Sequence, residues 1–311
     1  MVLKICCFVF TYNKYISDKM ETVQILNIDL KEHDVNVKKG LVLAGGGVLG
    51  TVHVGALSEL FKLGYKFDYF VGSSIGAFIC TLLSCRCPIQ DMIYMMMNLD
   101  YSAIYGGNVC LSGMYNTFKN KGWYNTNKLR EMYSNVIKDL CGKSTITFQE
   151  IYKQYGTHLA MTATHLSTSS IVFFDRNTHP EMSVVDACVY SSTAPFVFTS
   201  NEYVDGGLID NYPIGYMHDL IGEESTLGIN FHKTSTHTQR NPDTLLNFIH
   251  IITDIILEQA FELHLTEEGI KNTITVNIPD ISSFKLSISN SEKEKLFKYG
   301  VDAIKNYFNL F

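Results

Sequence analysis

Ser74 is the residue in this sequence best placed to do chemistry. It lies at the centre of a Gly-x-Ser-x-Gly motif at residues 72–76. An apolar run at 69–71 precedes the motif, and a second one at 77–83 follows it. Such a motif between a strand and a helix is typical of a nucleophile elbow, where a tight turn presents the serine hydroxyl above the strand end. Gly72 and Gly76 permit the turn, and Ser74 is a candidate nucleophile for acyl transfer.

A glycine-rich turn lies upstream of this serine. Residues 40–44 predict a buried strand, and Gly45, Gly46 and Gly47 follow it at once. Apolar residues then recur at helical spacing over 52–61. Backbone N–H groups in a strand-to-helix turn of this kind are free to point at an anion. In an acyl hydrolase that anion is the oxygen of the tetrahedral intermediate, so these glycines are candidate oxyanion-hole donors, supported by Gly50.

The same glycines also fit a dinucleotide-binding pattern. Gly45, Gly47 and Gly50 match Gly-x-Gly-x-x-Gly, a motif that requires an acidic residue closing the second strand. Asp68 lies in the right region, but it begins its apolar run instead of ending it. The second strand ends at the serine motif, which favours the oxyanion interpretation.

A third motif is Asp205-Gly206-Gly207, which ends a short apolar stretch. By itself, an Asp-Gly pair indicates a hairpin turn between two strands. Its occurrence together with the serine motif and the glycine loop favours a functional role, with the two glycines allowing close backbone approach.

The three motifs together resemble those of the patatin-like phospholipase family, roughly over residues 38–232. Asn211, Pro213, His53, Gly55 and Leu57 add to the resemblance. It implies a catalytic dyad, with Ser74 as nucleophile, Asp205 as general base, and Gly45, Gly46 and Gly47 as the oxyanion hole. It further implies release of fatty acids from glycerophospholipids, with no metal and no cofactor required. Partial desolvation of Asp205 would raise its proton affinity toward the working pH.

One position departs from the family pattern. The family usually carries Arg or Lys just before the last glycine of the first motif, where this chain has Leu49. Without this cation the oxyanion site could stabilise negative charge less strongly. A catalytically decayed lipid-binding protein is therefore an alternative. Lys38, Lys39 or Arg86 could supply the missing cation.

A histidine-dependent triad is a further alternative. α/β-Hydrolases carry serine, acid and histidine in that chain order, and His232 follows Asp205 at the end of a predicted strand at 227–231. His218, His250 and His264 lie on predicted helices and are weaker candidates. His53 could support the glycine loop, although a packed core histidine is the plainer interpretation.

Composition limits the partners and the compartment. The chain has 311 residues, of which 46% are hydrophobic and 18% charged, and its net charge is −6. This charge argues against nucleic acid and against strong electrostatic attraction to anionic membranes. No apolar run is long enough to span a bilayer, and the one at 5–10 is too short for a signal peptide. We expect a cytoplasmic protein with eight reduced cysteines, of undetermined oligomeric state, that meets lipid or membrane surfaces only transiently.

Strand and helix patterns alternate along the chain. This favours an α/β fold, with a mostly parallel central sheet and helices on both faces in three α/β/α layers. We expect an N-terminal extension at 1–36, a catalytic domain at 37–232, and C-terminal helices and a strand at 233–311 that complete the same domain. Other predicted strands are 22–28, 158–163, 171–174 and 273–278; predicted helices are 88–97, 127–140, 148–155, 184–191 and 243–265, and a final helix opened by a capping box at Ser291–Glu294. The Met- and Tyr-rich segment 92–105 could border the acyl pocket, touch a bilayer, or form a plain core helix.

Overall fold

A computed structural model describes residues 38–104, 119, 121–200, 202–234, 243–262, 271–279, 281, 283, 285 and 287–310. Residues 35–311 belong to one compact unit. The predicted extension at 1–36 and its strand at 22–28 lie outside the described residues, and the proposed domain boundaries stay a prediction.

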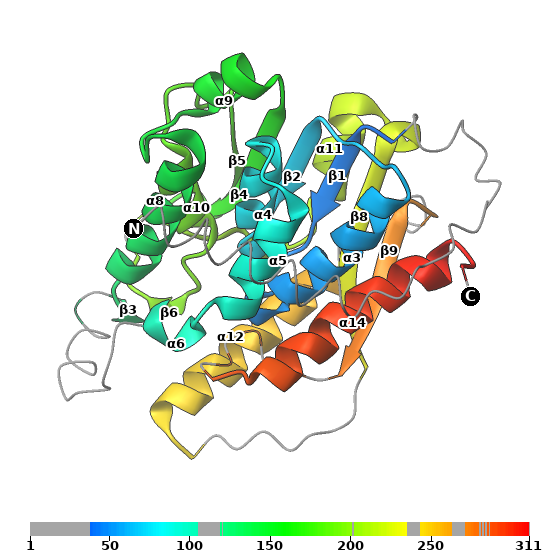
Figure 1. Cartoon of the computed structure of the whole chain (residues 1–311). Coiled ribbons are helices and arrows are strands. Elements are labelled where there is room, and N and C mark those ends of the chain that lie inside the picture. Colours follow the sequence, from blue (N-terminus) through cyan, green and yellow to red (C-terminus); the bar gives the residue numbers. More distant parts are fainter. Residues whose placement is uncertain are drawn as a thin grey trace. The chain divides into compact units, whose positions relative to one another are not determined.

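The centre of the unit is a seven-stranded, mostly parallel sheet (Figure 1). Its parallel strands lie in the order β4, β2, β1, β8 and β9, whereas β5 and β7 run antiparallel to β4. The bounds are β1 (Gly40–Leu43), β2 (Tyr69–Gly72), β4 (His158–His165), β5 (Ser170–Asp175), β7 (Tyr203–Asp205), β8 (Thr226–Thr234) and β9 (Thr273–Pro279). The interior strand β1 is a fully buried apolar run, as expected for a parallel strand covered on both faces.

Helices cover both faces of this sheet. Figure 1 shows α3 (Gly50–Lys62), α4 (Ile75–Ser84) and α14 (Asn290–Tyr307) in front of the sheet and α11 (Ile214–Ile221) behind it. Helix α14 packs along α3 and against β9, which itself pairs with β8. The predicted three-layer α/β/α architecture is confirmed.

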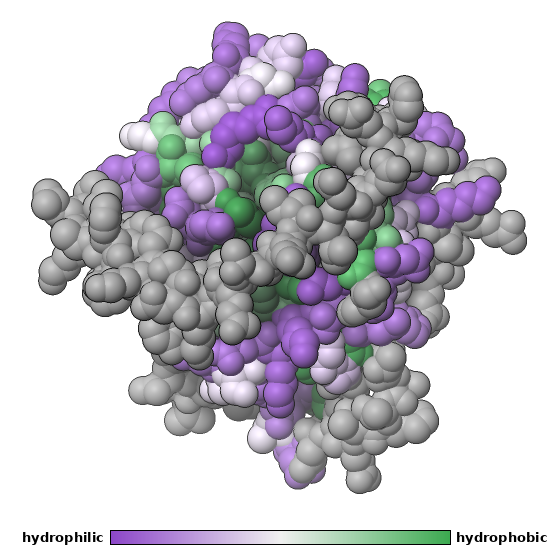
Figure 2. All heavy atoms as spheres, turned by 45° about the vertical axis from the view of Figure 1, so that its right-hand side comes forward, coloured by the Kyte–Doolittle hydropathy of each residue, from purple (hydrophilic) through white to green (hydrophobic). Residues whose placement is uncertain are grey.

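The remaining elements surround this core. They are α5 (Ile89–Asn98), α6 (Tyr101–Ile104), α8 (Asn127–Cys141), α9 (Phe148–Tyr155), α10 (Val184–Ser191), α12 (Leu245–Glu262), the short helices η1 (Gly47–Leu49), η2 (Gly206–Leu208) and η3 (Glu223–Ser225), and a two-stranded sheet of β3 (Gly122–Tyr124) and β6 (Phe196–Phe198). On the face drawn in Figure 2, hydrophilic residues cover most of the described surface and hydrophobic ones show mainly in hollows. None of the described helices combines the length and apolarity needed to cross a membrane.

The last helix begins earlier than its sequence pattern predicts. The capping box uses Ser289 and Glu292, so the predicted box at Ser291–Glu294 is wrong by two residues. The Ser289 hydroxyl accepts the Glu292 N–H at 3.3 Å, and the Glu292 carboxylate accepts the Ser289 N–H at 2.9 Å. Both pairs have the same spacing, so spacing by itself does not distinguish them.

The Met-rich helix α5 packs on the core through two of its methionines. Met92 and Met96 are fully buried, whereas Tyr94 is exposed. A Cβ atom at Gly50 would lie 2.7 Å from the Met96 methyl group, so α5 packs directly beneath the start of α3. The plain-core interpretation therefore holds for these methionines, and Tyr105 lies outside the described residues.

Candidate active site

Ser74 has the conformation of a nucleophile elbow. It lies two residues after the end of β2 and caps α4 with φ 50° and ψ −121°, a region that residues other than glycine rarely adopt. A Cβ atom at Gly72 would lie 2.5 Å from the Gly76 carbonyl carbon, and one at Gly76 would lie 2.3 Å from the Leu43 oxygen. The turn therefore requires glycine on both sides of the serine.

Strand pairing brings Asp205 to this serine. Strands β2 and β5 occupy the two edges of β4, and β5 already pairs with Ala163. Strand β7 also pairs with β4 there, with Asp205 opposite Ala163, so it must lie on the β2 edge. The partner of Gly72 on β4 is Met161, two residues before Ala163. Strand β7 thus runs toward the end of β2 and delivers Asp205 at the level of Ser74.

The Asp205 carboxylate is buried and held in place. Its Oδ1 accepts the Gly207 N–H at 2.8 Å, and its own N–H donates to the Thr193 carbonyl at 2.9 Å. Burial raises the pKa of Asp205 to about 6, opposed by the hydrogen bond from Gly207 N–H and by the nearby hydroxyls of Ser74 and Ser73. The Ser73 contact lacks standard hydrogen-bond geometry, because this buried oxygen has no such partner among the described residues. A desolvated carboxylate beside a serine hydroxyl can act as a general base near neutral pH.

The glycine loop after β1 is fixed through its carbonyl groups. Asn211 Nδ2 donates to the Gly45 oxygen at 3.3 Å, and Leu49 N–H donates to the Gly46 oxygen at 3.0 Å. No peptide bond in the described chain is cis. Because C=O and N–H point in opposite directions across a trans peptide, the N–H groups of Gly46 and Gly47 are directed away from these donors. Neither N–H donates a recorded hydrogen bond within the described part of the chain.

Gly45 differs from its two neighbours. Its N–H donates to the Asn211 carbonyl at 3.0 Å, so it is already satisfied. The Gly45 N–H is therefore not available to an oxyanion, and of the three predicted donors Gly46 and Gly47 are left as candidates. Gly45 still borders the site, because a Cβ atom at this position would lie 3.3 Å from Ser74 Cβ.

Asn211 and the glycines after Asp205 lock the motifs together. A Cβ atom at Gly207 would lie 2.5 Å from Asn211 Oδ1, and one at Gly206 would lie 2.1 Å from Thr162 Oγ1. The segment 205–207 enters η2 instead of forming a hairpin turn, so the hairpin alternative is wrong. Side chains at these glycines would separate Asp205 from the loop and the elbow.

Sequence motifs did not point to Ser191, which also contacts the elbow. Its hydroxyl accepts the Ser74 N–H at 2.9 Å. Ser191 ends α10, 117 residues after Ser74, and no motif surrounds it. Only the packing of α10 beside α4 brings it to the site.

None of the three candidate cations replaces the missing Arg or Lys. Leu49 is buried against Gly46. Arg86 pairs with Asp68 at 2.6 Å, just before β2, and Lys38 Nζ donates to Asn272 Oδ1 at 2.6 Å, just before β1. Lys39 likewise precedes β1. All three therefore lie at the starts of these strands, at the opposite end of the sheet from Ser74, so none of them is placed to substitute.

His232, the candidate histidine of a triad, is not among the groups that interact with the Asp205 carboxylate. His232 is exposed on β8, opposite Asn277 of β9, and it is not among the groups that shift the Asp205 pKa. His218 faces Glu223 at 3.8 Å, His250 lies on α12, and His264 is outside the described residues. Within the described ranges, no three His, Cys, Asp or Glu side chains are grouped to hold a metal.

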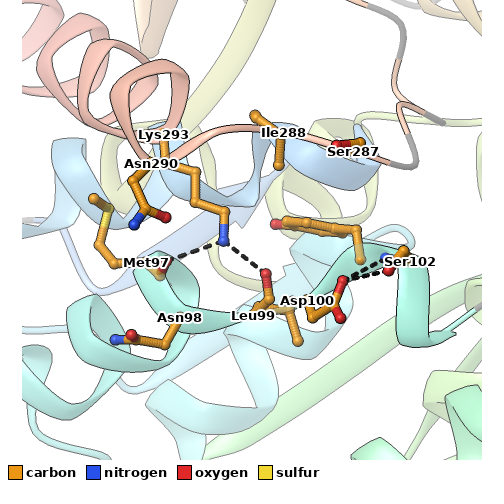
Figure 3. Close-up of a pocket in the computed structure, with 10 residues that line it drawn as sticks. Met97, Asn98, Leu99, Asp100, Ser102, Ser287, Ile288, Asn290 and Lys293 are labelled. Atoms are coloured by element: carbon orange, nitrogen blue, oxygen red, sulfur yellow. Dashed lines mark hydrogen bonds between the residues drawn. The ribbon is translucent and has the colours of Figure 1, made fainter.

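A cleft of about 320 Å³ lies apart from these residues (Figure 3). It is lined by the end of α5, by α6 and by the segment leading into α14. Lys293 reaches across it and donates to the carbonyls of Met97 at 3.0 Å and Leu99 at 2.6 Å. None of the predicted site residues lines this cleft, so its polar groups belong to the docking of α14 on α5.

The three-layer α/β/α fold brings the serine motif, the glycine loop and the Asp205 segment together at one end of the sheet. The patatin-like phospholipase family model matches residues 41–218, and the chain belongs to this family. The dinucleotide-binding alternative is therefore wrong, which agrees with the pairing of Asp68 and Arg86.

The chain is similar in sequence to viral and yeast proteins, and in fold to a bacterial one. The chain is 27% identical to an uncharacterized protein of Acanthamoeba polyphaga mimivirus, covering 86% of this chain and 92% of that protein. It is 26% identical to a probable lipid hydrolase of Invertebrate iridescent virus 6, covering 57% and 62%. Triacylglycerol lipase 4 of Saccharomyces cerevisiae is 24% identical, but the match spans only 24% of that enzyme. The crystal structure of VipD from Legionella pneumophila has the same fold, with a TM-score of 0.57, 15% identity, and coverage of 95% of this chain and 73% of that one.

Proposed function

We propose that the protein is a serine acyl hydrolase that releases fatty acids from glycerophospholipids. The observation that carries this proposal is the placement of the Ser74 hydroxyl beside the buried Asp205 carboxylate, whose pKa burial raises to about 6. Membership of the patatin-like phospholipase family supports it.

The reaction follows from the positions of these groups. Ser74 Oγ attacks the ester carbonyl carbon while its proton passes to Asp205. The oxygen that becomes negative accepts the N–H groups of Gly46 and Gly47. Collapse of this intermediate breaks the bond to the alcohol, which takes the proton from Asp205 and leaves an acyl-serine. Water then attacks the acyl group by the same route, with Asp205 taking its proton and returning it to Ser74 Oγ as the fatty acid departs.

A dyad is favoured over the Ser74/Asp205/His232 triad. A triad needs an imidazole between the serine and the acid, whereas here the serine hydroxyl lies near enough to the acid to lower its pKa and His232 is exposed on β8. An aspartate with a pKa near 6 is ionised at pH 7, yet basic enough to accept a proton as the serine attacks.

The lipid surface is proposed to meet the apolar face of α12. Leu245, Phe248 and Ile255 are each 45–49% exposed at helical spacing on this helix. Helix α12 packs against η2, the segment that follows Asp205. Because the net charge is −6, contact with lipid would rely on such apolar groups. We place this encounter at the cytoplasmic surface of a membrane or lipid aggregate.

The proposal is tested by incubating the protein with phosphatidylcholine, lysophosphatidylcholine and triacylglycerol, and measuring released fatty acid. We expect release from the phospholipid, and none from Ser74→Ala. A serine-directed phosphonate should label Ser74 in the wild type and leave Ser74→Ala unlabelled. Preferential cleavage of triacylglycerol would make triacylglycerol the substrate class in place of glycerophospholipids, and the proposed Ser74/Asp205 mechanism would stand. Absence of both labelling and release would favour the decayed lipid-binding alternative.

A further inference from the structure

His53 contacts the glycine loop from within the core. It is fully buried on α3, and its Nε2 lies 2.8 Å from the carbonyl oxygen of Ala44, the residue before Gly45. A carbonyl only accepts hydrogen bonds, so Nε2 carries the proton and donates it. Nδ1 is then unprotonated, and this buried atom has no hydrogen-bond partner among the described residues.

The imidazole stays neutral wherever the protein is folded at ordinary pH. Burial lowers the pKa of His53 to about 4, with the bond to Ala44 opposing that shift. A neutral ring with a fixed Nε2 proton is a constant donor, because it neither gains nor loses charge over the pH range in which Asp205 titrates.

Apolar contacts fix the ring and the loop together. The His53 and Phe231 rings have centroids 4.4 Å apart. A Cβ atom at Gly46 would lie 3.0 Å from Phe231 Cε2 and 3.1 Å from Leu49 Cδ1. Leu49 occupies the position where the family usually has a cation. The loop therefore packs against the apolar side chains of Leu49 and Phe231, and the His53 imidazole supplies its polar contact.

The bond to Ala44 controls the first peptide group of the loop. The carbonyl of that peptide accepts from His53, and its N–H, on Gly45, donates to Asn211. A planar trans peptide held at both ends cannot rotate. The peptides that follow begin from this fixed plane, and they carry the N–H groups of Gly46 and Gly47.

We propose that His53 is a positioning residue: by holding the Ala44 carbonyl, it sets the orientation of the Gly46 and Gly47 N–H groups toward the developing oxyanion. The inference rests on the proposed function. It assigns His53 no proton transfer, because its one N–H is engaged with Ala44.

The experiment compares three substitutions at this position with a control. His53→Leu removes the donor but keeps an apolar side chain. His53→Gln carries an amide NH₂ at about the reach of Nε2, whereas His53→Asn carries one at about the reach of Nδ1. Ser58→Ala is the matched control, because Ser58 is also buried on α3 but donates only to Gly55 of the same helix.

Steady-state hydrolysis of a water-soluble p-nitrophenyl ester supplies kcat and KM. We expect kcat of His53→Leu to fall by about 10²-fold with KM within a factor of two, since misplaced donors weaken the transition state more than substrate binding. His53→Gln should recover most of kcat, and His53→Asn should not. The rate at which a phosphonate labels Ser74 should fall in parallel, and Ser58→Ala should match the wild type.

Three outcomes would overturn the inference. The first is a folded His53→Leu protein whose kcat stays near the wild-type value. The second is an equal kcat for His53→Gln and His53→Asn, and this comparison can be made even if the Leu variant does not fold. The third is a change in the midpoint of the pH–rate profile of His53→Gln, because a positioning residue leaves the titration of Asp205 unchanged. Failure of the proposed function is distinguishable, since the wild type itself would then show no Ser74-dependent turnover.

Discussion

Asn211 holds Gly45 from both sides of the residue. Its backbone carbonyl accepts the Gly45 N–H at 3.0 Å, and its side-chain Nδ2 donates to the Gly45 oxygen at 3.3 Å. The same side chain lies against Gly207, two residues after Asp205. One asparagine therefore joins the proposed oxyanion loop to the proposed base.

Asn211→Ala should uncouple these two elements. The backbone bond remains, but the Gly45 carbonyl loses its side-chain donor and the loop gains freedom. We expect kcat on the p-nitrophenyl ester to fall by about 10²-fold, as for other misplacements near a reacting centre. Asn277→Ala, at an exposed position on β9, is the control and should be silent. An unchanged kcat in a folded Asn211→Ala protein would contradict the clamp.

The pH–rate profile should report Asp205. Its pKa is about 6, and only the ionised form can take the serine proton. We expect kcat/KM to rise with pH, with a midpoint near 6, and to level off above pH 7. Asp205→Asn should lose activity at every pH. A profile that stays flat from pH 5 to 8, measured with an ester whose binding does not titrate, would argue against this base.

The same group should reduce stability at high pH. Its pKa is about 6 when folded against an ordinary value of 3.8, so between these values the folded state keeps a proton that the unfolded state has lost. The free energy of unfolding should therefore fall as pH rises from 4 to 6 and stay lower above 6, by about 3 kcal/mol at most. Asp205→Asn should remove this part of the pH dependence and raise the Tm at pH 8. Urea unfolding of both proteins at pH 4.5 and 8 measures it, and equal pH dependence would refute the assignment.

His232→Ala should distinguish the two mechanisms. His232 is exposed on β8 and does not contact Asp205, so we expect turnover within a factor of two of the wild type. A loss of several orders of magnitude would instead establish a histidine-dependent triad. Ser74→Ala, assayed in parallel, marks the level of complete loss.

Polar substitutions on α12 should separate lipid contact from chemistry. We expect the double variant Phe248→Ser/Ile255→Ser to hydrolyse phosphatidylcholine vesicles several-fold more slowly, since its exposed apolar area is reduced. Its rate on the p-nitrophenyl ester should be unchanged. Leu166→Ser is the control, because Leu166 is 40% exposed in the β4–β5 turn. Equal losses on both substrates would point to damage to the site, and equal vesicle rates for all proteins would remove α12 as the lipid contact.

Local patterns in the sequence predicted much of this fold. The strand-to-helix turns after β1 and β2 depend on glycines and flanking apolar runs, which are short-range features. Gly64 has φ 89° directly after the C-cap of α3, as its place after that helix predicts. The capping box before α14 is where such rules fail, because two serine–glutamate pairs have the same spacing and the folded chain uses the earlier one.

Contacts between distant segments lay beyond that kind of prediction. The Gly45 N–H looks free in the sequence and is taken by Asn211, 166 positions away. Arg86 lies close to the elbow in the sequence and is a candidate cation for the site. In the folded chain it pairs with Asp68 at the other end of the strands. Ser191 carries no motif and still contacts the elbow backbone. Each of these contacts depends on which strand edges and helix ends pack together in the fold. A short stretch of sequence does not determine that packing.

The amino-acid sequence by itself determined the reactive groups and their family, because an elbow serine, a glycine turn and an Asp-Gly-Gly segment are each specified by a few neighbouring residues. Tertiary structure alone decided which groups are engaged. The antiparallel pairing of β7 with β4 brings Asp205 to Ser74, and burial on α3 gives His53 a single donor. Hydrogen bonding and desolvation depend on distances that only the folded chain establishes.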